Sequence, residues 1–191
     1  SAYHANVRPH KVAIKDLSAK KELTYLDLDR RANRLAAWLQ GQGVAKGDRV
    51  AILSQNCPEF FELEFACAKI GAVELPLNWR LTKPELEYIL CDSQPSVLIY
   101  DETFSEISTA LLLDCDIKSS LEINQNDISN QYEIALSGSH DAPTVVECYQ
   151  EDLIMIMYTS GTTGHPKGAM ITHQMQLYNA INLAAPALVT T

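Results

Sequence analysis

The sequence has no long hydrophobic run and no excess of positive charge. Its apolar stretches are far shorter than the roughly 20 residues that a helix needs to cross a bilayer, and its first residues lack the charged-then-apolar pattern of a signal peptide. The formal net charge is −9, whereas proteins that bind nucleic acid or anionic membranes present a basic face. We therefore expect no transmembrane segment, no nucleic-acid partner and a cytoplasmic location.

Cysteine and histidine show none of the spacings that bind metals or carry out redox chemistry. The five cysteines are odd in number, widely spaced and without a C-x-x-C pair, and the five histidines have no metal-ligand spacing. In a reducing compartment such thiols stay free. We expect no zinc site and no disulfide among Cys57, Cys67, Cys91, Cys115 and Cys148.

Strand-like and helix-like segments alternate through the first hundred residues. Arg49–Ser54 and Ala72–Leu77 are predicted strands, and Pro58–Ile70 between them is a predicted helix. We expect Phe61, Phe65 and Ala68 on its inner face. Strand, helix and strand within so short a span predict a βαβ unit with parallel strands and a right-handed crossover.

Similar patterns lie on both sides of this unit. Short strands are predicted at Val12–Lys15 and Leu23–Thr24, and a helix that begins near Thr24 carries an apolar stripe. A capping box formed by Thr82 and Glu85 precedes a helix over Lys83–Cys91, and a strand follows at Ser96–Tyr100. The stripe consists of Leu28, Ala32, Leu35, Ala36 and Leu39.

The fold class predicted from this alternation is α/β, a doubly wound, mostly parallel sheet with flanking helices. We expect an N-terminal α/β subdomain over 9–137, a linker region over 138–150, and the start of a second, incomplete subdomain over 151–191. Thr103–Leu113 is a predicted helix, whereas 114–142 is polar and aperiodic, which indicates surface connections with one poorly marked strand.

The second subdomain begins with the most distinctive stretch of the chain. Leu153–Tyr158 is a short apolar run that suits a strand buried on both faces. The loop Thr159–Gly168 then offers four hydroxyls, three glycines and Lys167, and Gly168–Thr172 is a second predicted strand, so we expect a hairpin. Glycines allow backbone N–H groups to face a ligand, and the hydroxyls and the ammonium add donors, which predicts an anion-binding loop.

A Walker A motif does not explain this loop. That motif requires G-x-x-x-x-G-K-[ST] between a strand and a helix. Here His165 and Pro166 separate Gly164 from Lys167, and Gly168 stands where Ser or Thr is required. A surface hairpin without a ligand is the other structural interpretation, but a solvated turn does not need so many glycines and hydroxyls around one lysine.

The run Y-T-S-G-T-T-G-H-P-K-G over 158–168 resembles the phosphate-loop signature of the AMP-forming acyl-adenylate ligases, with His165 at a variable position. Segments near 43–56, 69–82 and 85–90 are also similar to that family, especially to members that use fatty or aromatic acids. The resemblance implies that the fold is the N-terminal part of the large domain of such a ligase. It also implies an acid–CoA ligase that uses ATP, Mg²⁺ and coenzyme A to turn a carboxylic, fatty-type acid into an acyl-adenylate and then an acyl-CoA.

The same resemblance assigns roles to residues of the loop. Lys167 would stabilise phosphate charge during catalysis, and Thr162 would help to hold Mg²⁺. His173 and the Asn78–Arg80 segment are interpreted as structural, Arg80 in an ion pair. The contacts to the β and γ phosphates are assigned to Thr159, Ser160, Gly161, Thr162, Thr163, Gly164 and Lys167.

Other functions stay open at this point. The family's adenine, ribose, acyl-pocket, hinge and C-terminal lysine motifs are not found in the chain, so we expect a fragment that is inactive alone and that self-associates through an exposed edge, a homodimer being one outcome. An amino-acid adenylation domain, a non-catalytic nucleotide or phosphate binder, and an assembly domain with a vestigial loop are the alternatives.

Overall fold

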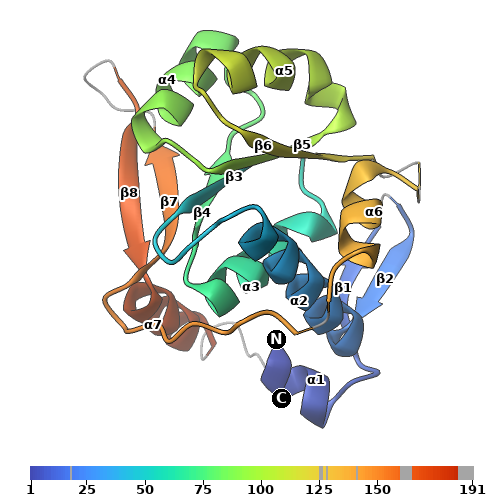
Figure 1. Ribbon diagram of the computed structural model, residues 1–191. Helices are drawn as coiled ribbons and strands as arrows, with labels where there is room; N and C mark the ends of the chain where they lie inside the picture. Colours follow the sequence, from blue (N-terminus) through green and yellow to red (C-terminus); the bar gives the residue numbers. More distant parts are fainter. Residues whose placement is uncertain (18, 125–126, 128, 141, 160–164, 185–191) are drawn as a thin grey trace.

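The computed structural model describes residues 1–17, 19–124, 127, 129–140, 142–159 and 165–184. Its centre is a six-stranded sheet in the order β6-β5-β3-β4-β7-β8, and a separate two-stranded sheet pairs β1 with β2 (Figure 1). The strands are β1 (Val12–Asp16), β2 (Lys21–Thr24), β3 (Arg49–Leu53), β4 (Val73–Leu77), β5 (Val97–Asp101), β6 (Ser119–Ile123), β7 (Leu153–Thr159) and β8 (Lys167–Thr172).

Helices lie on both faces of the large sheet. α2 and α3 pack on one face, and α4 and α5 pack on the other (Figure 1). The helices are α1 (Ala2–Val7), α2 (Tyr25–Gly41), α3 (Pro58–Ile70), α4 (Lys83–Ser93), α5 (Ser105–Asp114), α6 (Gln131–Ser137) and α7 (His173–Ala184), with a 3-10 turn over Glu102–Phe104 before α5.

The strand pairing confirms the predicted fold class. β3 pairs in parallel with β4 and β5, β5 with β6, and β4 with β7; only the β7–β8 pair of the large sheet is antiparallel. Successive residues of β3 point to opposite faces, so Val50 and Ile52 enter the core under α2 and α3, whereas Ala51 and Leu53 enter the core under α4 and α5. All four are fully buried, as expected for a sheet covered on both faces.

Local signals predicted the start of two helices correctly. The Thr24 Oγ1 accepts a hydrogen bond from the Asp27 N–H at 3.2 Å, and the Asp27 carboxylate accepts one from the Thr24 N–H at 3.1 Å. Glu85 likewise accepts from the Thr82 N–H at 2.8 Å at the start of α4. The predicted stripe of α2 is buried along its whole length, at Leu28, Ala32, Leu35, Ala36 and Leu39.

The predicted inner face of α3 is wrong. Phe61 is 48% exposed, whereas Leu63, Ala66 and Cys67 are fully buried. α3 packs on both the sheet and α2, and it is apolar around most of its circumference, so its own periodicity did not identify which stripe meets the core.

A charged network joins three helices at one edge of the core. Arg31 of α2 donates to Glu62 of α3 at 2.6 Å and makes a two-pronged contact with Glu133 of α6 at 2.7 and 2.9 Å. The Tyr132 hydroxyl donates to the other Glu62 oxygen at 2.7 Å. The helix α6 lies inside 114–142, where only surface connections and one strand were expected; β6 is that strand, and α6 was missed.

The prediction that every cysteine is free is also wrong. Cys91 of α4 and Cys115, just after α5, form a disulfide with their Cα atoms 5.2 Å apart, while Cys57, Cys67 and Cys148 are free. The two partners are 24 positions apart in the sequence and meet only because α4 and α5 lie side by side on one face of the sheet.

Candidate functional site

The predicted phosphate loop connects two antiparallel strands, as expected. Thr159, the last residue of β7, lies opposite Lys167, the first residue of β8, and Tyr158 lies opposite Gly168. The pairing of β7 with β8 therefore holds the two ends of the loop next to each other. The expectation that β7 is buried on both faces is wrong, because β7 lies beside the edge strand β8 and Met157 is 45% exposed.

Most of the predicted phosphate contacts lie outside the described residues. These are Ser160, Gly161, Thr162, Thr163 and Gly164, and the proposed Mg²⁺ contact of Thr162 is among them. Thr159 and Lys167 are described, and both are exposed. Within the described part of the chain, Lys167 makes no ion pair, so its ammonium is available to an anion.

A cavity of about 390 Å³ adjoins the first residue of this loop. It lies between α4, the segment that follows β4, and the end of the hairpin. β4 and β7 run in parallel, so the cavity is at the carboxyl end of both strands, where open α/β sheets bind ligands. Its lining consists of Asn78, Leu81, Pro84, Glu85, Tyr88, Ile89, Tyr158, Thr159, His165 and Pro166.

Two side chains of α4 contact the residues on either side of the loop. The Tyr88 ring stacks on the His165 imidazole, with centroids 4.7 Å apart and an interplanar angle of 22°. One turn further on, the Asp92 carboxylate accepts a hydrogen bond from the Tyr158 hydroxyl. Burial, aided by that carboxylate, raises the pKa of Tyr158, so the phenol stays protonated and can donate.

Gly168 makes room for this arrangement. A Cβ atom at this position would lie 2.9 Å from Ile156 Cγ2 and 3.2 Å from two atoms of the Tyr158 ring. The ring therefore lies directly over the backbone of β8, and a side chain at 168 would displace it. Sequence reasoning singled out neither Tyr88 nor Asp92, because nothing in the local pattern of a helix shows which loop it will meet.

The two segments interpreted as structural behave differently. The Arg80 guanidinium lies over the Trp79 ring at 4.1 Å rather than in the expected ion pair, and no acidic partner is seen within the described residues. The His173 backbone N–H donates to the Asp152 carbonyl at 3.1 Å at the start of α7, a main-chain contact that does not involve the imidazole ring. Its buried Nε2 has no hydrogen-bond partner in the described part of the chain.

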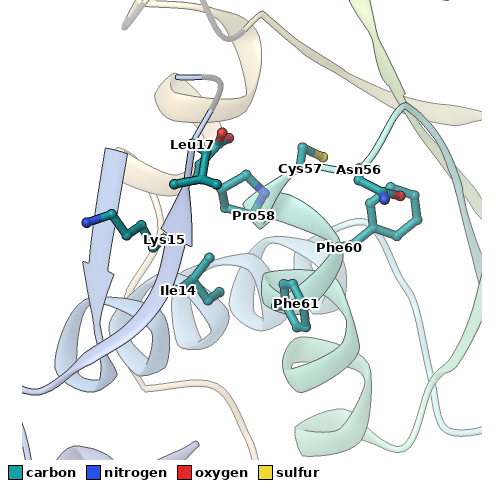
Figure 2. A pocket seen from close by; sticks show the side chains of 9 residues that line it. Ile14, Lys15, Leu17, Asn56, Cys57, Pro58, Phe60 and Phe61 are labelled. Atoms are coloured by element: carbon teal, nitrogen blue, oxygen red, sulfur yellow. The ribbon is translucent and has the colours of Figure 1, made fainter. Parts of the chain in front are cut away.

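A second cavity, also of about 390 Å³, lies between β1 and the start of α3 (Figure 2). Its lining is mainly apolar and includes Ile14, Pro58 and Phe61. None of the described site residues predicted from the sequence lies in it. Across the described ranges, no group of three or more His, Cys, Asp or Glu side chains is arranged to hold a metal ion, and no helix is long and apolar enough to cross a bilayer.

Comparison with known proteins identifies the family of the chain. Residues 2–190 match the family described as "AMP-binding enzyme". The chain is 39% identical over 179 residues to a feruloyl-CoA synthase of an Amycolatopsis species, covering 94% of this chain and 34% of that protein. It is 40% identical over 172 residues to the long-chain-fatty-acid–CoA ligase FadD13 of Mycobacterium tuberculosis, covering 89% of this chain and 33% of that protein.

Solved structures show the same fold. A fatty acyl CoA synthetase of Mycobacterium tuberculosis superposes with a TM-score of 0.80 at 35% identity, covering 90% of this chain and 33% of that one. The ATP-bound MatB of Rhodopseudomonas palustris superposes with a TM-score of 0.82 at 30% identity, covering 95% of this chain and 36% of that one.

The chain belongs to the AMP-binding enzyme family. Its relatives include ligases named for feruloyl, fatty-acid and indoleacetate substrates. The chain spans about a third of the length of the curated relatives it matches.

Proposed function

We propose that this chain is part of an AMP-forming acid–CoA ligase that activates a carboxylic acid of the fatty type. The observation that carries the proposal is the end of the β7–β8 hairpin, where Thr159 lines a cavity at the carboxyl edge of the sheet and pairs with Lys167, which makes no ion pair with a described residue. The names of the relatives support the reaction class, and the fatty-acid ligase among them supports the substrate class.

The proposed reaction has two steps. A carboxylate oxygen of the acid attacks the α-phosphate of ATP, the bond to the β-phosphate breaks, and acyl-adenylate and pyrophosphate form. A thiol, proposed to be that of coenzyme A, then takes the acyl group and releases AMP. In the first step negative charge develops on the departing pyrophosphate, so fixed donors that face it lower the barrier.

The loop residues would supply these donors. We assign the β- and γ-phosphate contacts to Thr159, the 160–164 segment and Lys167, whose ammonium is a compact charge with three donors. Oxygen atoms are the ligands that Mg²⁺ prefers, and the loop hydroxyls fit that preference. We assign one such contact to Thr162; the ion would neutralise phosphate charge there.

Two further features belong to the same proposal. We propose that the 191 residues are inactive by themselves, because a third of the length of the relatives does not supply every contact that places the acid in line with the α-phosphate. We also propose a cytoplasmic location and a tendency to dimerise. The three free cysteines support that location, whereas the Cys91–Cys115 bond is the observation against it.

Lys167→Ala tests the role of the loop. The variant is made in the full-length protein that contains this chain. We expect the rate of acid-dependent ATP–pyrophosphate exchange to fall at least about tenfold, which corresponds to about 1.4 kcal/mol of activation free energy, because one charged contact to a developing anion is lost. Lys15→Ala is the matched control, since Lys15 pairs with Glu22 on the distant β1–β2 sheet. Exchange at the wild-type rate in Lys167→Ala would refute the assignment, and the 191-residue chain serves as the inactive reference.

A further inference from the structure

We propose that Tyr88 and Asp92 of α4 are positioning residues for the phosphate-loop reaction, a pair that we call the α4 clamp. They touch neither phosphate nor acid in this proposal. Instead, they hold Tyr158 and His165, so that the nearby donors Thr159 and Lys167 are in place before ATP binds. The inference rests on the proposed function, because it concerns the same loop.

The spacing of the clamp matches the spacing of what it holds. Tyr88 and Asp92 are four residues apart, so both side chains project from one face of α4. Tyr88 stacks on His165, which follows the 160–164 segment directly, and Asp92 accepts from Tyr158, which precedes that segment by two residues. One helix face therefore contacts both ends of the loop.

The helix that carries the clamp is itself fixed. Leu86, Ile89 and Leu90 of α4 are buried in the core against the sheet. At its first turn Lys83 pairs with Asp114 of α5 at 2.5 Å, and at its last turn the Cys91–Cys115 disulfide joins the same two helices. Because α4 is fixed to the core, Tyr88 and Asp92 give His165 and Tyr158 contact partners that do not move.

The loop side of the contact also fits this role. His165 is exposed, and stacking on Tyr88 is the ring contact that the structure gives it. Pro166 follows with a restricted φ, and Lys167 then enters the ladder of β8 opposite Thr159. The stacking of His165 on Tyr88 therefore restricts the backbone that precedes Lys167. The β7–β8 pairing restricts the backbone of Lys167 itself.

The physical consequence is preorganisation. Ordering a side chain or a backbone segment around an anion costs conformational entropy, and contacts that restrict the backbone near Thr159 and Lys167 beforehand reduce that cost. Fixed donors also stabilise developing charge without rearranging during the reaction. Removing the clamp should therefore weaken pyrophosphate binding and slow acyl-adenylate formation, with little effect on the KM for the acid.

The test compares four variants of the full-length protein, Tyr88→Ala, Tyr88→Phe, His165→Ala and the double variant Tyr88→Ala/His165→Ala. The readouts are acid-dependent ATP–pyrophosphate exchange and calorimetric binding of magnesium pyrophosphate. We expect each alanine variant to lose about threefold to tenfold in both, the range of an aromatic pair, and Tyr88→Phe to stay near wild type because the ring remains. The double variant should lose no more than either single variant, since both remove one contact.

Tyr149→Ala is the matched control. Tyr149 also packs on a neighbouring side chain, with Lys46 Nζ 5.0 Å from its ring centroid, but it lies before the other end of β7. Wild-type values for this variant and lowered values for Tyr88→Ala would support the clamp. Tyr158→Phe, which removes the hydroxyl that Asp92 accepts from, should lower pyrophosphate binding in the same direction.

Two results would overturn the clamp. One is a double variant whose losses multiply, which would show that Tyr88 and His165 act separately. The other is pyrophosphate binding at the wild-type level in His165→Ala, an exposed position whose replacement does not disturb the core, while Lys167→Ala is impaired. If Lys167→Ala itself binds and exchanges normally, the proposed function fails and the clamp fails with it.

Discussion

Glu74 gives the sharpest stability prediction that the structure allows. It lies on β4 between Val50 of β3 and Met155 of β7, and it is 2% exposed. Its Oε2 has no hydrogen-bond partner within the described residues. Burial, and then the nearby Glu64 carboxylate, raise the pKa of Glu74 from 4.5 to about 8. The native state therefore prefers a neutral Glu74.

This pKa shift makes stability depend on pH in a defined direction. Between pH 4.5 and 8 the native state keeps a proton on Glu74 that the unfolded chain has lost, so the free energy of unfolding falls as the pH rises. The full contribution is present below pH 4.5 and is lost by about pH 8. At roughly 1.4 kcal/mol for each pH unit, the ceiling on the loss is on the order of 5 kcal/mol.

Glu74→Gln isolates this contribution. Glutamine stays neutral at every pH, and its amide adds a constant cost because its buried N–H groups need partners. Urea unfolding of both proteins at half-unit steps from pH 4.5 to 9 gives the difference between them. As the pH rises across this range, we expect the free energy of unfolding of the variant to increase by a few kcal/mol relative to that of wild type. Most of this change should occur below pH 8.

Glu64→Gln provides the control. It removes the charge that helps to raise the Glu74 pKa, so the pH-dependent loss in an otherwise wild-type chain should end at a lower pH. If the difference in free energy of unfolding between wild type and Glu74→Gln stays constant from pH 4.5 to 9, the reasoning is refuted. A constant difference would mean that Glu74 titrates normally in the fold.

Two other predictions concern the core and the cysteines. Arg31→Leu should lower the free energy of unfolding by about 3 to 5 kcal/mol in urea denaturation, because it leaves the buried Glu62 charge without its cation. Glu133→Gln removes the more exposed partner of Arg31 and should lower the free energy of unfolding clearly less. Equal losses in the two variants would contradict the burial argument. Thiol titration of the denatured protein without reductant should find three groups, Cys57, Cys67 and Cys148, and five groups would contradict the Cys91–Cys115 bond.

Local patterns in the sequence determined the fold class and most strands and helices of the large sheet and its flanking layers. The capping boxes at Thr24 and Thr82 work within one helical turn, and the stripe of α2 has one face toward the core, so both could be predicted without tertiary information. The order of strands and helices then predicted a mostly parallel sheet. The Gly- and Thr-rich segment indicated a phosphate loop because its chemistry lies within ten consecutive residues.

Tertiary structure alone decided which distant residues meet. α3 is apolar on several sides, so only its position between the sheet and α2 shows that Phe61 faces outward. α6 is a seven-residue helix, too short for a clear periodic signal, and its Tyr132 bonds to Glu62, 70 positions earlier. The Cys91–Cys115 bond and the stacking of Tyr88 on His165 likewise depend on how α4 is placed against α5 and the hairpin, and no local propensity encodes that placement.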